Sequence, residues 1–241
     1  MALTLRGSAA DIKVTGIRTL IFFLRILFLA TCWLESALNF ITFSCVLDKR
    51  AFERITDIEG KCTEKYYGQI FSLLPEKVKP ETRETFMAYD GMNNLFNLAY
   101  EVLRWKIQKA LVKAKLEPYL GFLHSNQMGK MSLVCDFQEL YRYLIDDFLI
   151  QYSQRISKRD FIAKTEVTTR RKKGKREYLN DSETKILMDE LNSFFESIVS
   201  VKRIRNGEHQ TIETLINEEA LLFAKYLRGE IKNWAPRIAN G

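Results

Sequence analysis

Proline and glycine are scarce in this chain, and apolar residues recur at helical spacing along most of its length. The 241 residues include 4 prolines and 11 glycines, a composition that favours long helices with short connections. The clearest periodicity lies in residues 90–115, where Asp90 is a candidate N-cap and apolar residues follow at intervals of three and four. The same spacing predicts further helices over residues 49–74, 136–152, from about 181, and 211–229. We therefore expect an all-α, multi-helix fold.

Residues 17–47 are the most apolar part of the chain. Arg25 and Glu35 interrupt this run, so it holds no unbroken span of the roughly 20 apolar residues that a transmembrane helix needs. A second apolar stretch continues past any plausible cleavage site, which disfavours a signal peptide. We favour a buried helix pair here and keep a membrane-associated segment as the alternative.

Charge and cysteine usage narrow the classes of function. The formal net charge of +7 favours a polyanionic partner, either nucleic acid or an anionic membrane surface. Much of this charge lies in residues 170–176, a basic run with Gly174 that suggests a loop or short hairpin and could contact a phosphate backbone. The 4 cysteines form no C-x-x-C pair, so neither a zinc ribbon nor a redox motif is indicated.

Residues 116–142 carry the strongest chemical signal. Pro118 ends the preceding helix, and the short apolar turn after it leads to His124, one of 2 histidines in the chain. Asp136 then opens the next predicted helix, and Glu139 follows on the same face. An imidazole and two carboxylates at one helix junction would suit Mn²⁺, or Mg²⁺ with waters. Asp136 and Glu139 also fit a capping box, which the spacing alone favours.

Five groups of residues form motifs along the chain: Glu59, Gly60, Tyr66 and Tyr67; Asp90, Asn93, Asn97, Tyr100 and Leu103; Leu116, Glu117, Pro118, Leu120, Gly121, Phe122, Leu123 and His124; Ser132, Leu133, Asp136, Glu139 and Arg142; and Leu215, Ile216, Ala220, Ala224, Tyr226, Leu227, Arg228 and Gly229. In their order and spacing, these motifs resemble the CRISPR-associated adaptation integrases, the endonuclease Cas1 (Cas-one). The resemblance covers roughly residues 50–235, and its central motif favours the metal site over the capping box. Phe96 stands where the family has an aliphatic residue, and residues 1–48 lack the alternating strands of the family's β-rich N-terminal domain.

The resemblance implies a set of site residues. The catalytic ligands of Mg²⁺ or Mn²⁺ would be Glu59, His124 and Glu139. Asp136 would support these ligands or be an alternative ligand. Asn93 and Asn97 would either line this site or bond the backbone. The candidate DNA contacts are Arg83, Arg142, Arg170, Arg171, Lys172, Lys173, Lys175 and Arg176.

The resemblance also implies a function and an organisation. Residues 49–241 would form a helical domain like the C-terminal catalytic domain of the family, and residues 1–48 a divergent segment where the β-rich domain is truncated or replaced. The expected activity is metal-dependent DNA cleavage and integration in CRISPR spacer acquisition, an antiviral defence. The expected partners are DNA, a second copy in a homodimer, and the small adaptation partner Cas2 (Cas-two). The expected location is the cytoplasm, and no stable membrane partner is expected.

Two other classes remain open. The first is a catalytically impaired DNA-binding scaffold of the same family, in which the divergent front prevents the active assembly. The second is a membrane-associated helical protein anchored by residues 17–47.

Overall fold

The structure is a computed structural model that describes residues 61, 63–86, 88–121, 124, 128–167, 173–200 and 209–236. The chain divides into two units, residues 1–83 and 84–241, and each is described by itself. Three of the expectations concern residues outside this description: the domain boundary at residue 48, the apolar segment 17–47, and Glu59.

In the first unit, residues 63–72 are helical, as the periodicity of residues 49–74 predicts. Tyr67, Ile70 and Phe71 are buried at helical spacing. The Arg83 guanidinium lies over the ring of Tyr67, 5.3 Å from its centroid, a cation–π arrangement.

The second unit is built on α4, Gly91–Lys113. The Asp90 side chain accepts a hydrogen bond from the backbone N of Asn93 at 2.7 Å, so the predicted N-cap is confirmed. At the other end, Lys115 takes a left-handed φ of 60°, and the N–H of Leu116 donates to the carbonyl of Leu111 at 3.0 Å. This Schellman turn ends α4 before Pro118 is reached.

Two short helices follow where the sequence predicts one. Helix α5 covers Ser132–Glu139 and α6 covers Arg142–Ser153. The prediction that a single helix opens at Asp136 and runs to Tyr152 is therefore wrong. The N–H groups of Leu140 and Tyr141 donate three residues back, to Phe137 and Gln138, which tightens the backbone between α5 and α6. No proline or glycine marks this break, so the apolar periodicity passes through it unchanged.

A β-hairpin leads away from α6. After the 3₁₀ turn Lys158–Asp160, β1 (Phe161–Val167) pairs antiparallel with β2 (Lys173–Leu179). The N–H of Glu177 in β2 donates to the Tyr89 carbonyl at 2.9 Å, and Asn94 Nδ2 donates to the Glu177 carbonyl at 2.8 Å. The hairpin suggested for the basic run is thus present, and it is fixed to the start of α4.

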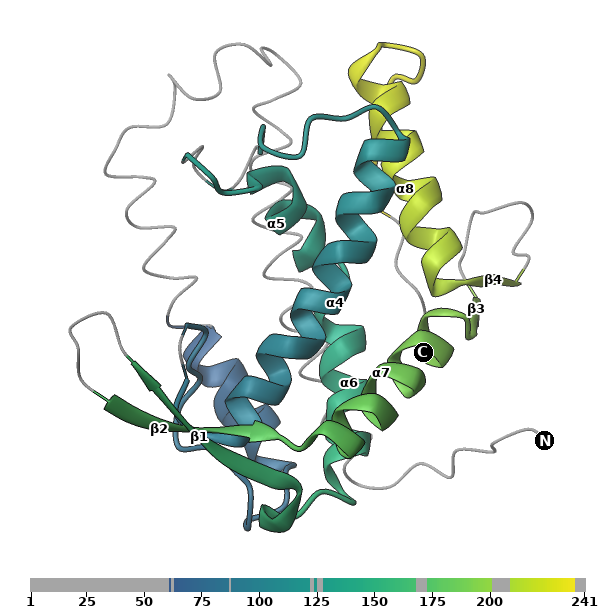
Figure 1. The fold of residues 1–241 in the computed structure, drawn as a ribbon. Coiled ribbons are helices and arrows are strands. Elements are labelled where there is room, and N and C mark those ends of the chain that lie inside the picture. The colour runs from purple at the N-terminus through teal and green to yellow at the C-terminus, as the bar shows by residue number, and fades with distance from the viewer. Residues whose placement is uncertain are drawn as a thin grey trace. The chain divides into compact units, whose positions relative to one another are not determined.

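The remaining elements are α7 (Asp181–Phe195), β3 (Ile198–Ser200), β4 (His209–Thr211) and α8 (Ile212–Leu227). Asn180 and Thr211 cap the two helices, and Gly229 takes a φ of 74° just after α8, as expected for a helix end. Figure 1 shows α4 at the centre of this unit, where it contacts α5, α6, α8 and β2.

The core of this unit consists mainly of aliphatic and aromatic side chains from these helices, including the fully buried Leu103, Ile107, Ile145, Leu191 and Leu215. Helices dominate the described residues, and their strands form only two two-stranded sheets. The expectation of an all-α class is confirmed. None of the helices searched, all within the described ranges, is long and apolar enough to cross a bilayer.

Candidate metal centre

The turn after α4 is fastened to the first turn of α5. The N–H of Leu133 donates to the Pro118 carbonyl at 3.0 Å. Gly121 lies directly against α5: a Cβ there would be 2.6 Å from the Cβ of Ser132 and 2.8 Å from Oδ2 of Asp136. Only glycine fits this contact without displacement, so the Pro118–Gly121 turn is held tightly against the helix.

His124 and Asp136 meet at this junction. Asp136 Oδ1 accepts hydrogen bonds from the backbone N of His124 at 3.0 Å and from its ring Nδ1 at 2.6 Å. The Asp136 side chain has no exposed surface, while that of His124 is 30% exposed. Asp136 lies in the interior of α5, whose N-cap is Met131 without a side-chain cap. The capping-box interpretation of Asp136 is therefore wrong, because its carboxylate holds the histidine.

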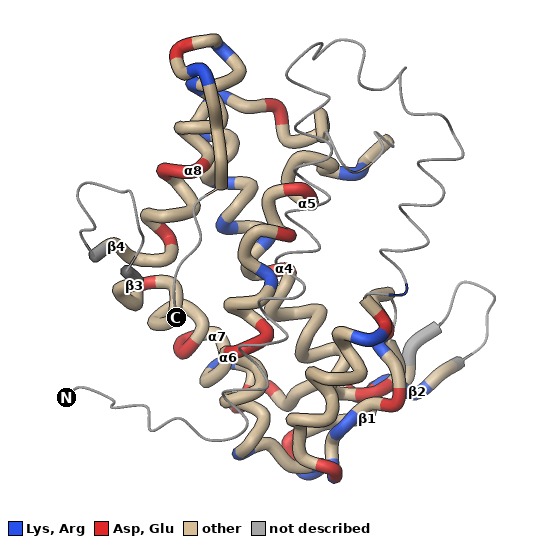
Figure 2. The backbone as a smooth tube through the Cα atoms, turned by 180° about the vertical axis from the view of Figure 1, so that it is seen from behind, with Lys and Arg blue, Asp and Glu red and all other residues tan. Residues whose placement is uncertain are grey.

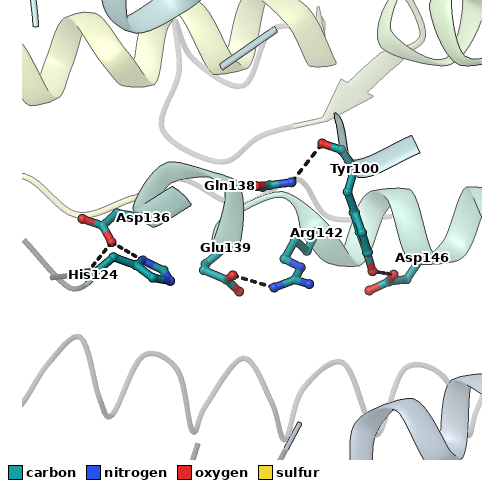
Figure 3. Close-up of polar contacts among 7 residues, drawn as sticks. All are labelled: Tyr100, His124, Asp136, Gln138, Glu139, Arg142 and Asp146. Atoms are coloured by element: carbon teal, nitrogen blue, oxygen red, sulfur yellow. Dashed lines mark hydrogen bonds and ion pairs between the residues drawn. The ribbon is translucent and has the colours of Figure 1, made fainter. Parts of the chain in front are cut away.

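Glu139 ends α5 one turn beyond Asp136. Its Oε1 accepts a hydrogen bond from Arg142 at 2.6 Å, and both side chains are largely buried, with 17% and 23% exposed. The Arg142 guanidinium also lies 4.7 Å from the ring centroid of Tyr100. Figure 3 shows the His124 ring, the Glu139 carboxylate and the Arg142 guanidinium in a row on one side of α5 and α6.

Tyr100 connects this row to the core. Its carbonyl accepts a hydrogen bond from Gln138 Nε2 at 2.9 Å, and its hydroxyl donates to Asp146 (Figure 3). Asp146 is 1% exposed, so this hydrogen bond lies in the core. These contacts come from residues on both sides of the α5–α6 break, and the sequence gives no direct signal for them.

The remaining candidates for the metal site are placed as follows. Glu59 lies outside the described residues. Among the residues that are described, no group of three His, Cys, Asp or Glu side chains gathers as a complete metal site. Asn93 Oδ1 accepts from the backbone N of Glu84 at 3.1 Å, and Asn97 Nδ2 donates to the Glu84 carbonyl at 3.3 Å. The two amides bond the backbone, which was the alternative to lining the site.

The basic candidates do not share one environment. Lys175 is exposed, but Arg176 is only 5% exposed and its guanidinium lies 5.6 Å from the ring centroid of Tyr89. Residues 170–172 lie outside the described part of the chain, and only the backbone of Lys173 is described. Figure 2 shows Lys and Arg positions spread over several elements and interleaved with Asp and Glu. The assignment of DNA contacts stays a prediction.

Cys135, next to Asp136, is partly buried. Burial raises the pKa of its thiol, and the nearby positive charge of Arg104 offsets this only in part. A thiol with a raised pKa is a poor nucleophile at neutral pH. The chemistry that this junction offers is therefore that of its imidazole and carboxylates.

The sequence model of the family described as "CRISPR associated protein Cas1" matches residues 34–184, which is more than half of the chain. The chain belongs to the Cas1 family. The resemblance found in the motifs is thereby confirmed. A relative from Methanospirillum hungatei, the "CRISPR-associated endonuclease Cas1 4", is 28% identical over 186 residues, which cover 77% of this chain and 50% of the relative. This chain spans about half the length of the Cas1 relatives it matches.

Solved structures show the same fold. A casposase bound to its integration product has a TM-score of 0.64 at 23% identity and covers 77% of this chain and 50% of the casposase. A Cas6-RT-Cas1–Cas2 complex matches with a TM-score of 0.62 at 20% identity, over 76% of this chain and 19% of the matched one. These likenesses confirm the helical fold expected for a Cas1 catalytic domain.

Proposed function

We propose that this Cas1-family chain is a metal-dependent DNA endonuclease and integrase of CRISPR spacer acquisition. Its metal site would be formed by Glu59, His124 and Glu139, with Asp136 supporting the histidine. The relatives carry the name of CRISPR-associated endonucleases, and one structural neighbour is a casposase bound to an integration product.

The contact between His124 and Asp136 is the observation that supports this proposal. An ionised carboxylate only accepts hydrogen bonds, so with Asp136 ionised the Nδ1 atom of His124 carries the hydrogen. The other ring nitrogen, Nε2, then keeps its lone pair. Metal-bound histidines usually donate their second N–H to a carboxylate in this way, which fixes the tautomer and the ring orientation. Asp136 thus prepares His124 to be a ligand.

The donor set fits Mn²⁺ or Mg²⁺ chemically. Carboxylate oxygens with one imidazole suit Mn²⁺, and Mg²⁺ would keep several waters. When bound, such an ion neutralises a phosphodiester and stabilises its leaving oxygen. The chain itself would orient His124 through Asp136, hold Glu139 beside Arg142, and position the DNA backbone with exposed basic side chains such as Lys175.

We extend the proposal to partners. The matched chain of one structural neighbour belongs to a complex that contains Cas2, which supports Cas2 as the partner of this chain. A homodimer acting on DNA in the cytoplasm is the arrangement we infer for the working assembly.

The alternative that we keep is a catalytically impaired, DNA-binding scaffold of the same family. Such a protein would bind DNA without cleaving it.

The deciding experiment measures cleavage of branched and linear DNA by the purified chain with Mn²⁺, with Mg²⁺ and with EDTA. His124→Ala and Glu59→Ala remove proposed ligands, and His209→Ala is the matched control because it removes the other histidine. We expect metal-dependent cleavage that both ligand variants lose and the control keeps. Cleavage retained by His124→Ala would refute the assignment, and DNA binding without cleavage by the unaltered chain would favour the scaffold.

A further inference from the structure

The segment that follows α8 returns to the core through a single residue. After α8, the N–H of Gly229 donates to Tyr226 and that of Glu230 to Lys225, each at 2.9 Å, which reverses the chain direction. Most of residues 228–236 are exposed, yet Trp234 is only 4% exposed. Trp234 is therefore the anchor of this segment.

Trp234 enters a cluster of three aromatic rings. Its ring centroid lies 4.5 Å from that of Phe223 in α8 and 5.9 Å from that of Phe137 in α5, with an interplanar angle of 21° to Phe137. Phe137 and Phe223 also meet edge to face at 5.3 Å. Such pairs stabilise beyond the area they bury, because ring quadrupoles favour these geometries. Trp234 thus couples α5 to α8.

A buried carboxylate fixes the orientation of the indole. Glu219 has no exposed surface, and its Oε1 accepts a hydrogen bond from Nε1 of Trp234. Glu219 lies one turn before Phe223 on α8, so the hydrogen bond and the ring contact reach the same indole from neighbouring positions. A carboxylate in the core is costly unless it is hydrogen-bonded, so this bond favours the observed orientation of the indole.

The cluster lies behind the candidate site. Phe137 is fully buried and follows Asp136 directly in α5, two residues before Glu139. We infer that Trp234, oriented by Glu219, is a positioning residue that fixes α5 and so sets the placement of His124 and Glu139. This inference rests on the proposed metal site. It gives the segment that follows α8 a part in positioning the ligands of that site.

The test combines Mn²⁺ titration with amide hydrogen exchange of the full chain. We would compare Trp234→Ala with Trp105→Ala, a matched control because Trp105 is 54% exposed on α4. We expect Trp234→Ala to weaken Mn²⁺ binding by up to about 10-fold, less than the 10–100-fold usual for losing a group that bonds a ligand directly. Exchange should speed up in α5 peptides and stay unchanged in α7. The control should change neither measurement.

Two conservative variants keep the test decisive if Trp234→Ala does not fold. Glu219→Gln retains an acceptor for the indole and should bind Mn²⁺ nearly as the unaltered chain does, whereas Trp234→Phe keeps a ring, loses the N–H and should weaken binding. Unchanged Mn²⁺ affinity or unchanged α5 exchange in Trp234→Phe would overturn the inference, as would equal acceleration in α5 and α7.

His124→Ala separates the failure of this inference from the failure of the proposed function. If His124→Ala weakens Mn²⁺ binding and the Trp234 variants do not, the metal site stands and the positioning role is wrong. If His124→Ala leaves Mn²⁺ binding unchanged, the proposed metal site is wrong, and the positioning role that rests on it is overturned as well.

Discussion

Replacing Asp136 with asparagine tests the most specific contact at the junction. Asn has the same shape as Asp, so it fits the closed space beside Gly121 and Ser132. It removes the charge of a carboxylate that accepts two hydrogen bonds from His124, at 3.0 Å from the backbone N and 2.6 Å from Nδ1. The change therefore isolates the electrostatic part of the contact.

The size of the effect follows from these two bonds. A hydrogen bond to a charged group contributes about 1.5–3 kcal/mol and a neutral one about 0.5–1.5 kcal/mol, so each bond is weakened by about 1 kcal/mol. Two bonds together are weakened by about 2 kcal/mol, which corresponds to a roughly 30-fold weaker preference for the ordered His124. If Mn²⁺ requires that arrangement, its affinity should fall by about 10–30-fold, within the range known for supporting residues.

Isothermal titration of Mn²⁺ into the metal-free chain measures this change in affinity. Asp189→Asn, at an exposed position of α7, is the control for removing one negative charge at a distance. Urea unfolding in EDTA reports separately on the stability of the fold. The orienting role of the carboxylate is refuted if Asp136→Asn binds Mn²⁺ as the control does while His124→Ala no longer binds it.

Three further outcomes are expected. Gly121→Ala places a Cβ 2.6 Å from the nearest atom and should lower the free energy of unfolding by about 1–3 kcal/mol. Gly68→Ala is the control, because Gly68 faces open space and the change should not lower this free energy. Equal stability of the two variants contradicts the tight turn. Lys106 lowers the pKa of Glu213 through a hydrogen bond. The stabilisation of the fold by this ion pair is therefore present above the unfolded pKa of about 4.5 and disappears on acidification. Lys106→Met should remove about 0.2–1 kcal/mol at pH 7 and progressively less as the pH falls below about 4.5 in urea titrations. A pH-independent difference counts against the ion pair. Neutralising residues 170–176 should reduce the slope of log affinity for DNA against log salt by about 0.9 for each DNA phosphate that the run neutralises, and an unchanged slope removes the run from the interface.

Three helix ends were readable from the sequence because their signals are local. Asp90 and Thr211 cap α4 and α8 with bonds to backbone N–H groups three residues ahead, and Gly229 supplies the left-handed residue after α8. Residue type at one position decides each of these features. The hairpin around Gly174 was likewise suggested by local composition.

The details of the site depended on contacts between distant segments. Asp136 reads as a helix cap from its spacing to Glu139. In the fold, Gly121 packs against it from the turn after α4, and His124 is hydrogen-bonded to its carboxylate. The α5–α6 break has no proline or glycine to announce it. Gln138 beside the break donates to the Tyr100 carbonyl, a contact between segments far apart in the sequence. Periodicity reports which face is buried and not which partner the face meets.

Three buried carboxylates, one each in α5, α6 and α8, connect these helices to other segments of the fold. Asp136, Asp146 and Glu219 are each 2% exposed or less, and each binds a side chain of a different segment: His124, Tyr100 and Trp234. Apolar residues of similar shape often stabilise a core equally well. We therefore expect these pairs to set how the connected segments align: α5 with the turn after α4, α6 with α4, and α8 with the segment after it.

A double-mutant cycle on Tyr100 and Asp146 tests this explanation. Tyr100→Phe alone removes a hydrogen bond to a buried charge and should destabilise the fold by about 1.5–3 kcal/mol. Tyr100→Phe combined with Asp146→Leu also removes the charge and should recover much of that stability in urea unfolding. If the pair sets the position of Arg142 and Glu139, the double variant should still bind Mn²⁺ more weakly than the unaltered chain. Recovery of both stability and Mn²⁺ affinity would show that the pair contributes nothing to the site.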